Sequence, residues 1–256
     1  MSQTIIVTGA SRGLGAAGAR IAARLGARLV LNARSAGDLE AVAAQIRAAG
    51  GQAVAVAGDV TQPQICQDLV ATALASYGRL DAVVNNAGVL DPMARVADSD
   101  PSLWTRNLMV NLVGPYLLLR AALPHLREVN GRVVNVSSGL AVRAMAGVSV
   151  YCAGKAALNH FTAVLALEEP AVTCLAFRPG VVDTAMQAHI RRAGRQGMDE
   201  ADYQRFVRRH DQGELLPPEQ PGRALAVLAL GAPPAWSGQF IHWNEDRVQE
   251  LVQRYA

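Results

Sequence analysis

The sequence predicts an α/β protein whose parallel β-sheet is covered by helices on both faces. Along the 256 residues, short apolar runs rich in β-branched residues alternate with longer stretches of helical periodicity, and this alternation is typical of strand–helix–strand units. The apolar runs are continuous rather than interleaved with polar residues, as expected of strands buried on both faces. Successive parallel strands then need crossover connections, which are right-handed.

Seven segments have the pattern of strands and six have the pattern of helices. In chain order, the expected strands are 4–7, 28–32, 53–57, 82–84, 132–136, 172–177 and 239–241. The expected helices are 14–25, 37–49, 63–77, 102–127, 150–168 and 218–230. No linker and no internal repeat separates these elements, so we expect residues 1–256 to form one domain.

One segment, 184–216, breaks the alternation. It is polar and charged, with helical fragments between Gly194, Gly197 and Gly213. A connection of this length inside a compact domain is usually functional or mobile. Because it follows a late strand, it can fold over the carboxyl ends of the sheet, where ligands bind in such folds. We therefore interpret 184–216 as a substrate-covering flap, with a surface insertion as the alternative.

Composition excludes several classes of function. The net charge is +3 and the basic residues are scattered, so no tail for nucleic acid or a membrane surface is expected. No apolar run reaches the roughly 20 residues that span a bilayer. Three cysteines, Cys66, Cys152 and Cys174, form no close pair and have no metal-ligand spacing. We expect a cytoplasmic protein in a reducing compartment, without a metal site.

A glycine-rich turn between the first strand and the first helix predicts a dinucleotide site. Glycine permits a tight turn and close approach of the backbone, and the following helix N-terminus offers free N–H groups to a pyrophosphate. The spacing is Gly-x-x-x-Gly-x-Gly instead of the common Gly-x-Gly-x-x-Gly. The residues expected to bind the cofactor here are Gly9, Ser11, Arg12, Gly13, Leu14 and Gly15.

The end of the second strand predicts NADP(H) as the cofactor. An acidic residue at this place would bind the 2′-hydroxyl of the ribose in NAD, and the sequence Leu31-Asn32-Ala33-Arg34 has none,. Arg34, with Arg12 in the glycine turn, can form paired, charge-assisted hydrogen bonds to a 2′-phosphate. The alternative is that both are ordinary surface arginines.

Three further segments that follow strands complete the expected cofactor site. After the third strand, Asp59 and Val60 are expected to contact the adenine. The chain after the fourth strand contains a glycine and is expected to pass close to the cofactor, and the chain after the sixth strand is expected to reach the nicotinamide carboxamide. The residues of these two segments are Asn86, Ala87, Gly88, Pro179, Gly180, Val182 and Thr184.

Tyr151 and Lys155 indicate proton chemistry beside that cofactor, and both are also expected to bind it, Lys155 at the nicotinamide ribose. Residues four apart share one face of a helix, so the Lys155 ammonium is expected near the Tyr151 phenol, where it would lower the phenol pKa from roughly 10. Ser138, at the end of the fifth strand, can donate a hydrogen bond to a substrate oxygen as negative charge develops. Ser137 is the competing serine.

The Asn111 amide is expected to hold a water behind Lys155, with a helix-distorting structural role as the alternative. The histidines His189 and His210 are expected to be flap residues.

As a set, these motifs resemble the short-chain dehydrogenase/reductase family over most of the chain. The resemblance rests on 8–15, 59–60, 85–88, Asn111, Ser138, Tyr151, Lys155, 179–180 and Thr184. It implies a single Rossmann-type domain with strand order 3-2-1-4-5-6-7, and a catalytic Ser138–Tyr151–Lys155 centre assisted by Asn111. The resemblance also favours Ser138 over Ser137, because Tyr151 follows Ser138 by thirteen positions.

Within that family, segment 151–186 and the tail 237–243 look most like the sepiapterin-reductase and benzil-reductase group. His242 stands where sepiapterin reductases hold the pterin with an aspartate, which favours a less polar substrate. Leu90, Ala141, Val142, Met145 and Met186 are candidate apolar walls of the pocket. The resemblance therefore implies an NADPH-dependent reductase of ketones or 1,2-diketones. The alternatives are alcohol oxidation, sepiapterin reduction, and a non-catalytic NADP(H)-binding sensor.

The resemblance also implies a homodimer. Relatives pair the helices that carry Asn111 and Tyr151 across a two-fold axis. Here Gly114-Pro115 is expected to interrupt the first of these helices, and Pro170 to end the second early,.

Overall fold

Seven parallel strands form the centre of the protein, as described by a computed structural model for residues 2–255. The strand order is β3-β2-β1-β4-β5-β6-β7, and every neighbouring pair is parallel. Both the predicted fold class and the implied strand order are confirmed. The strands are β1 Thr4–Thr8, β2 Arg28–Ala33, β3 Gln52–Ala57, β4 Ala82–Asn85, β5 Arg132–Val136, β6 Thr173–Arg178 and β7 Phe240–His242.

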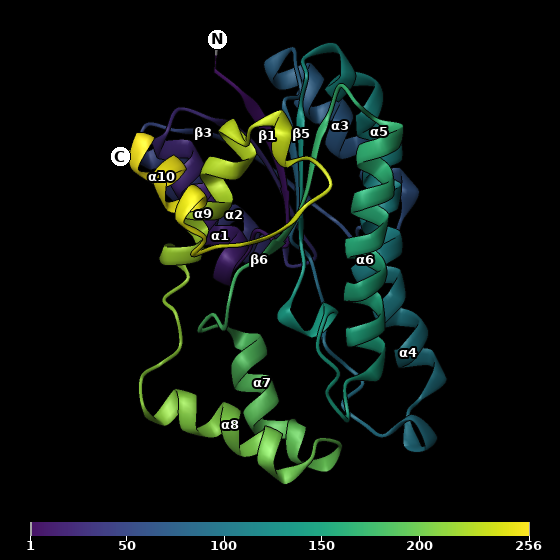
Figure 1. Cartoon of the computed structure of the whole chain (residues 1–256). Coiled ribbons are helices and arrows are strands. Elements are labelled where there is room, and N and C mark those ends of the chain that lie inside the picture. Colours follow the sequence, from purple (N-terminus) through teal and green to yellow (C-terminus); the bar gives the residue numbers. More distant parts are fainter. Residues whose placement is uncertain (1, 256) are drawn as a thin grey trace.

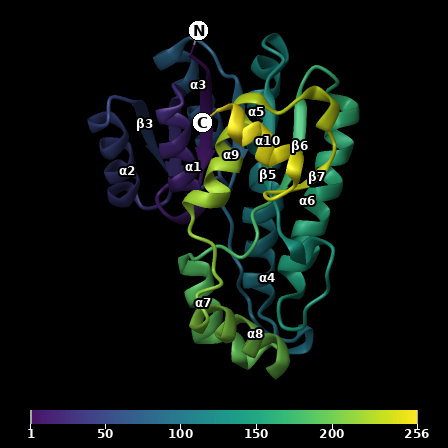
Figure 2. The ribbon, with the colours of Figure 1, turned by 60° about the vertical axis from the view of Figure 1, so that its left-hand side comes forward.

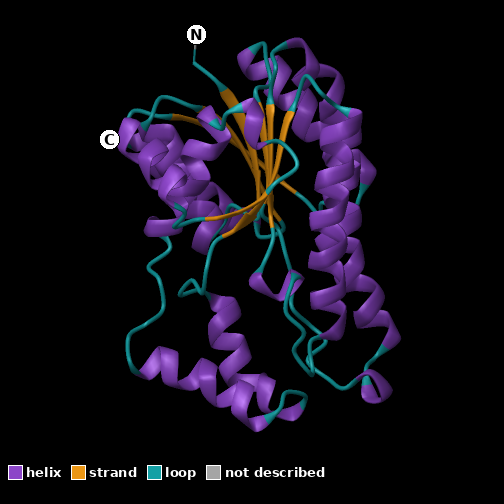
Figure 3. Ribbon diagram, viewed as in Figure 1, coloured by secondary structure: helices purple, strands orange, loops and turns teal. Residues whose placement is uncertain are grey.

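Helices cover both faces of the sheet, which Figure 3 shows between two purple layers. One apolar core lies between the sheet and α1, α2, α9 and α10, and a second lies between the sheet and α3, α5 and α6. Figure 2 shows the two helical layers from another side. The helices on the first face are α1 Gly13–Arg24, α2 Ala36–Ala48, α9 Glu219–Gly231 and α10 Asp246–Arg254. On the second face they are α3 Pro63–Tyr77, α4 Pro101–Leu108, α5 Gly114–Glu128 and α6 Ser149–Glu168.

The flap contains two helices, α7 Ala185–Ala193 and α8 Glu200–Asp211. They lie beyond the carboxyl ends of the strands, below the sheet in Figure 1. At the base of the flap, Leu216 donates its backbone N–H to Val181 O and accepts at its carbonyl from Asp183 N. This closure anchors both ends of the segment beside the sheet.

The expected interruption at Gly114-Pro115 is a change of helix type and not a break in the helical path. The chain passes from α4 through a π-helical segment, Met109–Val113, directly into α5. Pro115 cannot donate the hydrogen bond that an α-helix would direct to the carbonyl of Asn111. The wider π turn at this point lets the helical path continue, and such turns are frequent at functional sites.

No helix within residues 2–255 combines the length and apolarity needed to cross a bilayer. In the same part of the chain, no group of His, Cys, Asp and Glu residues has the arrangement of a metal site.

Candidate active site

The glycine turn after β1 is fixed by the loop after β4. The Asn86 amide Nδ2 donates to the carbonyls of Thr8 (2.9 Å) and Gly9 (3.1 Å), and the Thr8 hydroxyl accepts from the backbone N–H groups of Asn86 and Ala87 (both 3.0 Å). Gly9 has φ +63°, and a Cβ there would lie 2.8 Å from the Ala87 Cα. At Gly15 a Cβ would lie 2.4 Å from Asn86 Nδ2. Only glycine allows these two loops to meet.

The rim of this turn fits a dinucleotide phosphate. Arg12 and Arg34 are exposed, and their guanidinium groups pair with no residue among those that the structure describes. A Cβ at Gly13 would lie 3.1 Å from Thr184 Cγ2, so the base of the flap meets the glycine turn. The helix N-terminus of α1 and the base of the flap therefore border one stretch of surface. Arg34 follows β2, the strand that pairs with β1 on one side.

The Asp59 carboxylate holds the loop after β3 in place. Its carboxylate accepts from the backbone N–H (3.0 Å) and hydroxyl (2.8 Å) of Thr61, and it pairs with Arg106. These three donors fix the loop, so the direct contact between the Asp59 carboxylate and an adenine stays a prediction. Val60 is buried and packs against Gly114.

The loop after β6 brings the remaining predicted cofactor residues to the same edge. Gly180 has φ +82°, and a Cβ there would lie 2.8 Å from the indole Nε1 of Trp243. Val182 pairs with Leu216 at the base of the flap, and the Thr184 hydroxyl donates to the Val182 carbonyl (3.3 Å). Pro179 precedes this turn and is half-buried.

Ser138, Tyr151 and Lys155 come together at the carboxyl end of β5. The Ser138 side chain lies close enough to the Tyr151 phenol to lower the pKa of that phenol, and the Ser138 oxygen accepts from Leu140 N (3.1 Å). The Lys155 ammonium lies 5.8 Å from the centre of the Tyr151 ring and donates to the Val136 carbonyl (2.8 Å). The expected proximity of the serine, tyrosine and lysine side chains is thus present.

The expected lowering of the phenol pKa is not found. Burial raises the pKa of Tyr151 to about 12, although the hydrogen bond with Ser138 opposes the shift. Burial also lowers the pKa of Lys155 to about 8. Both shifts have one cause, because a low-dielectric surrounding disfavours the charged form of an acid and of a base. In this state the phenol is fully protonated at neutral pH.

Lys155 is the only lysine in the sequence, and the other 23 of its 24 lysine and arginine residues are arginines. An ammonium shifts its pKa when buried, whereas a guanidinium stays charged. The side chain is 4% exposed. A Cβ at Gly88 would lie 3.8 Å from its Nζ, so that glycine leaves room on the open side of the ammonium.

The Asn111 amide has a structural role, which was the alternative interpretation, and the water behind Lys155 stays a prediction. Its Nδ2 donates to the Val89 carbonyl and to Asn107 Oδ1 (both 2.7 Å), and its Oδ1 accepts from Val89 N (3.2 Å). Both amide protons are therefore used to hold the loop after β4 against the π-helical segment. Asn107 extends this contact by donating to the carbonyls of residues 89, 90 and 91. The sequence analysis missed Asn107, although its spacing of four from Asn111 was available as a signal.

An apolar cluster fills the space between Tyr151 and the flap. Four of the chain's six methionines belong to it. They come from the loop after β4 (Met93), the loop after β5 (Met145), α7 (Met186) and the turn before α8 (Met198). The other members are Leu90, Val148, Ile190, Leu140, Cys152, Ala193, Tyr203 and Phe206. Of the expected wall residues, Leu90, Met145 and Met186 lie in the cluster, whereas Val142 is 69% exposed.

One imidazole–carboxylate contact and two ion pairs at the rim of this cluster tie the flap to the loops. His189 contacts Asp91 (2.8 Å), Arg95 pairs with Asp199 (2.6 Å), and Arg143 pairs with Asp202 (2.9 Å). The backbones also touch, because a Cβ at Gly147 would lie 2.4 Å from the Gly197 carbonyl. His189 is therefore a flap residue, as expected, and His210 is also in the flap, beside Asp211.

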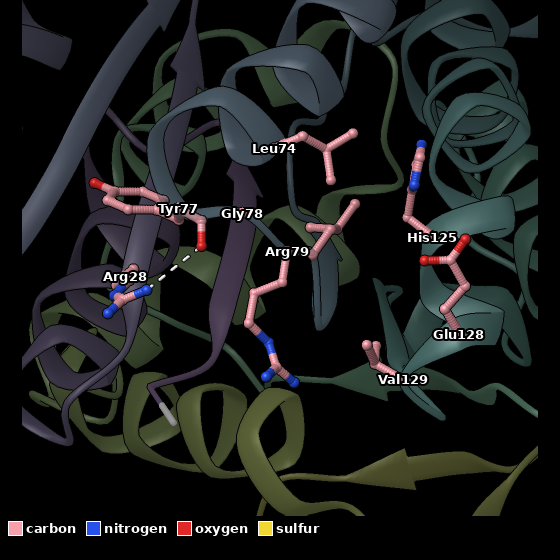
Figure 4. A pocket seen from close by; sticks show the side chains of 9 residues that line it. Arg28, Leu74, Tyr77, Gly78, Arg79, His125, Glu128 and Val129 are labelled. Atoms are coloured by element: carbon pink, nitrogen blue, oxygen red, sulfur yellow. Dashed lines mark hydrogen bonds between the residues drawn. The ribbon is translucent and has the colours of Figure 1, made fainter.

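A pocket of about 370 Å³ lies at the opposite, amino-terminal edge of the sheet (Figure 4). It is lined by the start of β2, the end of α3 and the end of α5. Arg79 is paired with Asp81, and Arg28 lies against the Tyr77 ring. None of the candidate catalytic residues borders this pocket.

A family model described as short chain dehydrogenase matches residues 3–194. An uncharacterized oxidoreductase of Schizosaccharomyces pombe is 36% identical over 94% of this chain and 96% of its own. A benzil reductase, (S)-benzoin forming, of Saccharomyces cerevisiae is 34% identical over 97% and 98%.

Two solved structures extend the likeness. The crystal structure of the enzyme KRED1-Pglu has a TM-score of 0.90 and 41% identity, covering 94% of this chain and 100% of that one. A single-substitution variant of actinorhodin polyketide ketoreductase, solved with NADPH, has a TM-score of 0.85 and 28% identity, covering 94% and 95%.

Proposed function

The chain belongs to the short-chain dehydrogenase family, an oxidoreductase family, and from that premise we propose that it is an NADPH-dependent carbonyl reductase. Its substrates in this proposal are apolar ketones and 1,2-diketones such as benzil. The observation that carries the proposal is that Ser138 and Lys155 both lie beside the Tyr151 phenol, whose burial keeps it protonated at neutral pH.

The proposed chemistry assigns one task to each residue. NADPH, when bound, supplies the hydride to the carbonyl carbon. The Tyr151 phenol donates its proton to the carbonyl oxygen as charge develops there, and its raised pKa keeps this proton available across neutral pH,. Ser138 donates a hydrogen bond to the same oxygen. The Lys155 ammonium stabilises the phenolate left behind.

NADP(H) is proposed over NAD(H) because of the two exposed arginines at the glycine turn. Arg12 and Arg34 both reach the surface there, and the carboxyl end of β2 offers no acidic side chain for a ribose hydroxyl,. The NADPH complex of the similar ketoreductase supports this choice. The proposed cofactor site comprises these arginines, the glycine turn and the loops after β3, β4 and β6.

The apolar cluster supports a bulky, uncharged substrate. Methionine is flexible and polarizable, so it adapts to ligands of irregular shape and favours contact with aromatic rings. Arg95 and Arg143, which tie the flap to the loops, pair with Asp199 and Asp202, so these charges already have counter-ions. The benzil reductase among the relatives supports the same substrate class. We further propose that the flap, 184–216, closes over the substrate within one domain spanning 1–256.

A homodimer is the proposed assembly. Four large apolar side chains are exposed on α4, α5 and α6, and such side chains mark interaction surfaces when they gather. The exposed fractions are 45% for Leu103, 47% for Tyr116, 38% for Val164 and 83% for Leu167.

The test is NADPH consumption against a panel of benzil, simple aryl ketones, sepiapterin and buffer alone. We expect rapid consumption with benzil and slow consumption with sepiapterin. Faster NADPH consumption with sepiapterin than with benzil would favour sepiapterin reduction. Binding of NADPH without turnover of any carbonyl would instead favour the sensor alternative.

A further inference from the structure

The ends of β5, β6 and β7 align beside Ser138. Val136, Phe177 and Ile241 occupy equivalent positions across these strands, and all three belong to the apolar core on the α1–α9 face. Successive side chains of a strand point to opposite faces. The next residue of each strand therefore points to the other face, which α6 covers.

Three polar residues occupy these next positions: Ser137, Arg178 and His242. Ser137 is 3% exposed, and within residues 2–255 neither its Oγ nor His242 Nε2 has a hydrogen-bond partner. The guanidinium of Arg178 is half-buried and forms no hydrogen bond or ion pair with a described residue. Since no described residue forms an ion pair with this guanidinium, another contact must hold it in place.

Gly139 supplies that reason. A Cβ at residue 139 would lie 2.9 Å from both Nε and Nη2 of Arg178 and 3.0 Å from Cζ. Nearly equal distances to three atoms mean that the guanidinium presents its planar face, and not its edge, to Gly139. Any side chain at 139 would displace this face, so the absence of a Cβ is what permits the contact.

The turn that begins at Ser138 carries the reacting hydroxyl. Its oxygen accepts from Leu140 N (3.1 Å), so the orientation of the Ser138 side chain depends on where 139 and 140 lie. We propose that Arg178 is a positioning residue for Ser138: its guanidinium packs against Gly139 and holds the turn that directs the Ser138 hydroxyl to Tyr151. This proposal rests on the proposed reaction.

The decisive test is a double-mutant cycle between Arg178→Ala and Ser138→Ala. A misplacement of about 1 Å can reduce a rate about 100-fold, so we expect Arg178→Ala alone to lower kcat for benzil about 10- to 100-fold. The KM for benzil should change less than about threefold, since the apolar walls are untouched. In the Ser138→Ala background the same substitution should change kcat less than about threefold. Arg24→Ala, at an exposed site in α1, is the matched control.

Two further variants separate packing from charge. Arg178→Lys keeps the charge but lacks the planar face. Its kcat should therefore stay nearly as low as that of Arg178→Ala. Gly139→Ala should lower kcat in the wild type and less so in the Arg178→Ala background, where the extra methyl has room. Full rescue by lysine, or an equal loss from Arg178→Ala with and without Ser138, overturns the proposal.

Amide hydrogen exchange at Leu140 gives an answer that does not need turnover. Arg178→Ala should accelerate exchange of this amide while the β5 and β6 amides stay protected. If the wild type reduces no carbonyl, the proposed function fails, and the Leu140 exchange still decides the role of Arg178. Unchanged exchange at Leu140 in Arg178→Ala overturns the positioning role.

Discussion

Replacing Lys155 with methionine should stabilise the folded protein at neutral pH while removing its activity. Burial lowers the pKa of Lys155 from 10.5 to about 8, and the side chain is 4% exposed. At about 1.4 kcal/mol per pKa unit, keeping this ammonium charged costs about 3 kcal/mol of folding free energy at pH 7. Lys155→Met removes that cost, less the hydrogen bond to the Val136 carbonyl, worth about 1 kcal/mol,.

The pH dependence distinguishes this cause from simple repacking. Between about pH 8 and 10.5 the unfolded chain binds a proton at Lys155 that the folded protein has released. The wild type should therefore gain about 3 kcal/mol of stability relative to Lys155→Met as pH rises through this window. Urea unfolding of both proteins at several pH values measures the difference, in which the titration of other groups cancels.

Direct titration is also possible because Lys155 is the only lysine. Protein labelled at the lysine ε-carbon should give a single side-chain NMR signal that titrates near pH 8 in the folded state. A titration near pH 10.5, the ordinary value for lysine, or a stability difference independent of pH, would refute the reasoning.

Three other substitutions test separate parts of the account. Arg34→Asp should lower the NADPH-to-NADH ratio of kcat/KM about 10-fold or more, whereas an unchanged ratio would remove the basis for NADP(H). Gly15→Ala should weaken NADPH binding and lower stability by about 1–3 kcal/mol, since its Cβ would lie 2.4 Å from Asn86 Nδ2,. Gly37→Ala, with no atom within 4 Å, should be neutral or stabilising in thermal unfolding,. Leu167→Glu should convert a dimer to a monomer in light scattering, while Val96→Glu, similarly exposed but elsewhere, should not.

The sequence was sufficient for the sheet because each strand is a β-branched run with distinct ends. All seven observed strands lie within one residue of the expected bounds. It was insufficient for α10, Asp246–Arg254, because only two of that helix's residues, Val248 and Leu251, are buried. A short helix that is mostly polar has little apolar periodicity to detect.

The candidate site could also be predicted only in part. The spacing of Tyr151 and Lys155 and the glycines after β1 could be recognised along the chain, because local geometry determines which residues share a face or a turn. The sign of the Tyr151 pKa shift could not, since it depends on burial by the flap and loops. Likewise, the Asn111 amide is used by Val89 and Asn107, a competition that only the folded arrangement reveals.

The most direct test of the central claim is Tyr151→Phe assayed for benzil reduction with NADPH. If the phenol is the proton donor, kcat should fall at least about 100-fold, while NADPH binding followed by fluorescence stays within a few-fold of the wild type. Reduction of benzil by Tyr151→Phe at the wild-type rate would contradict the account.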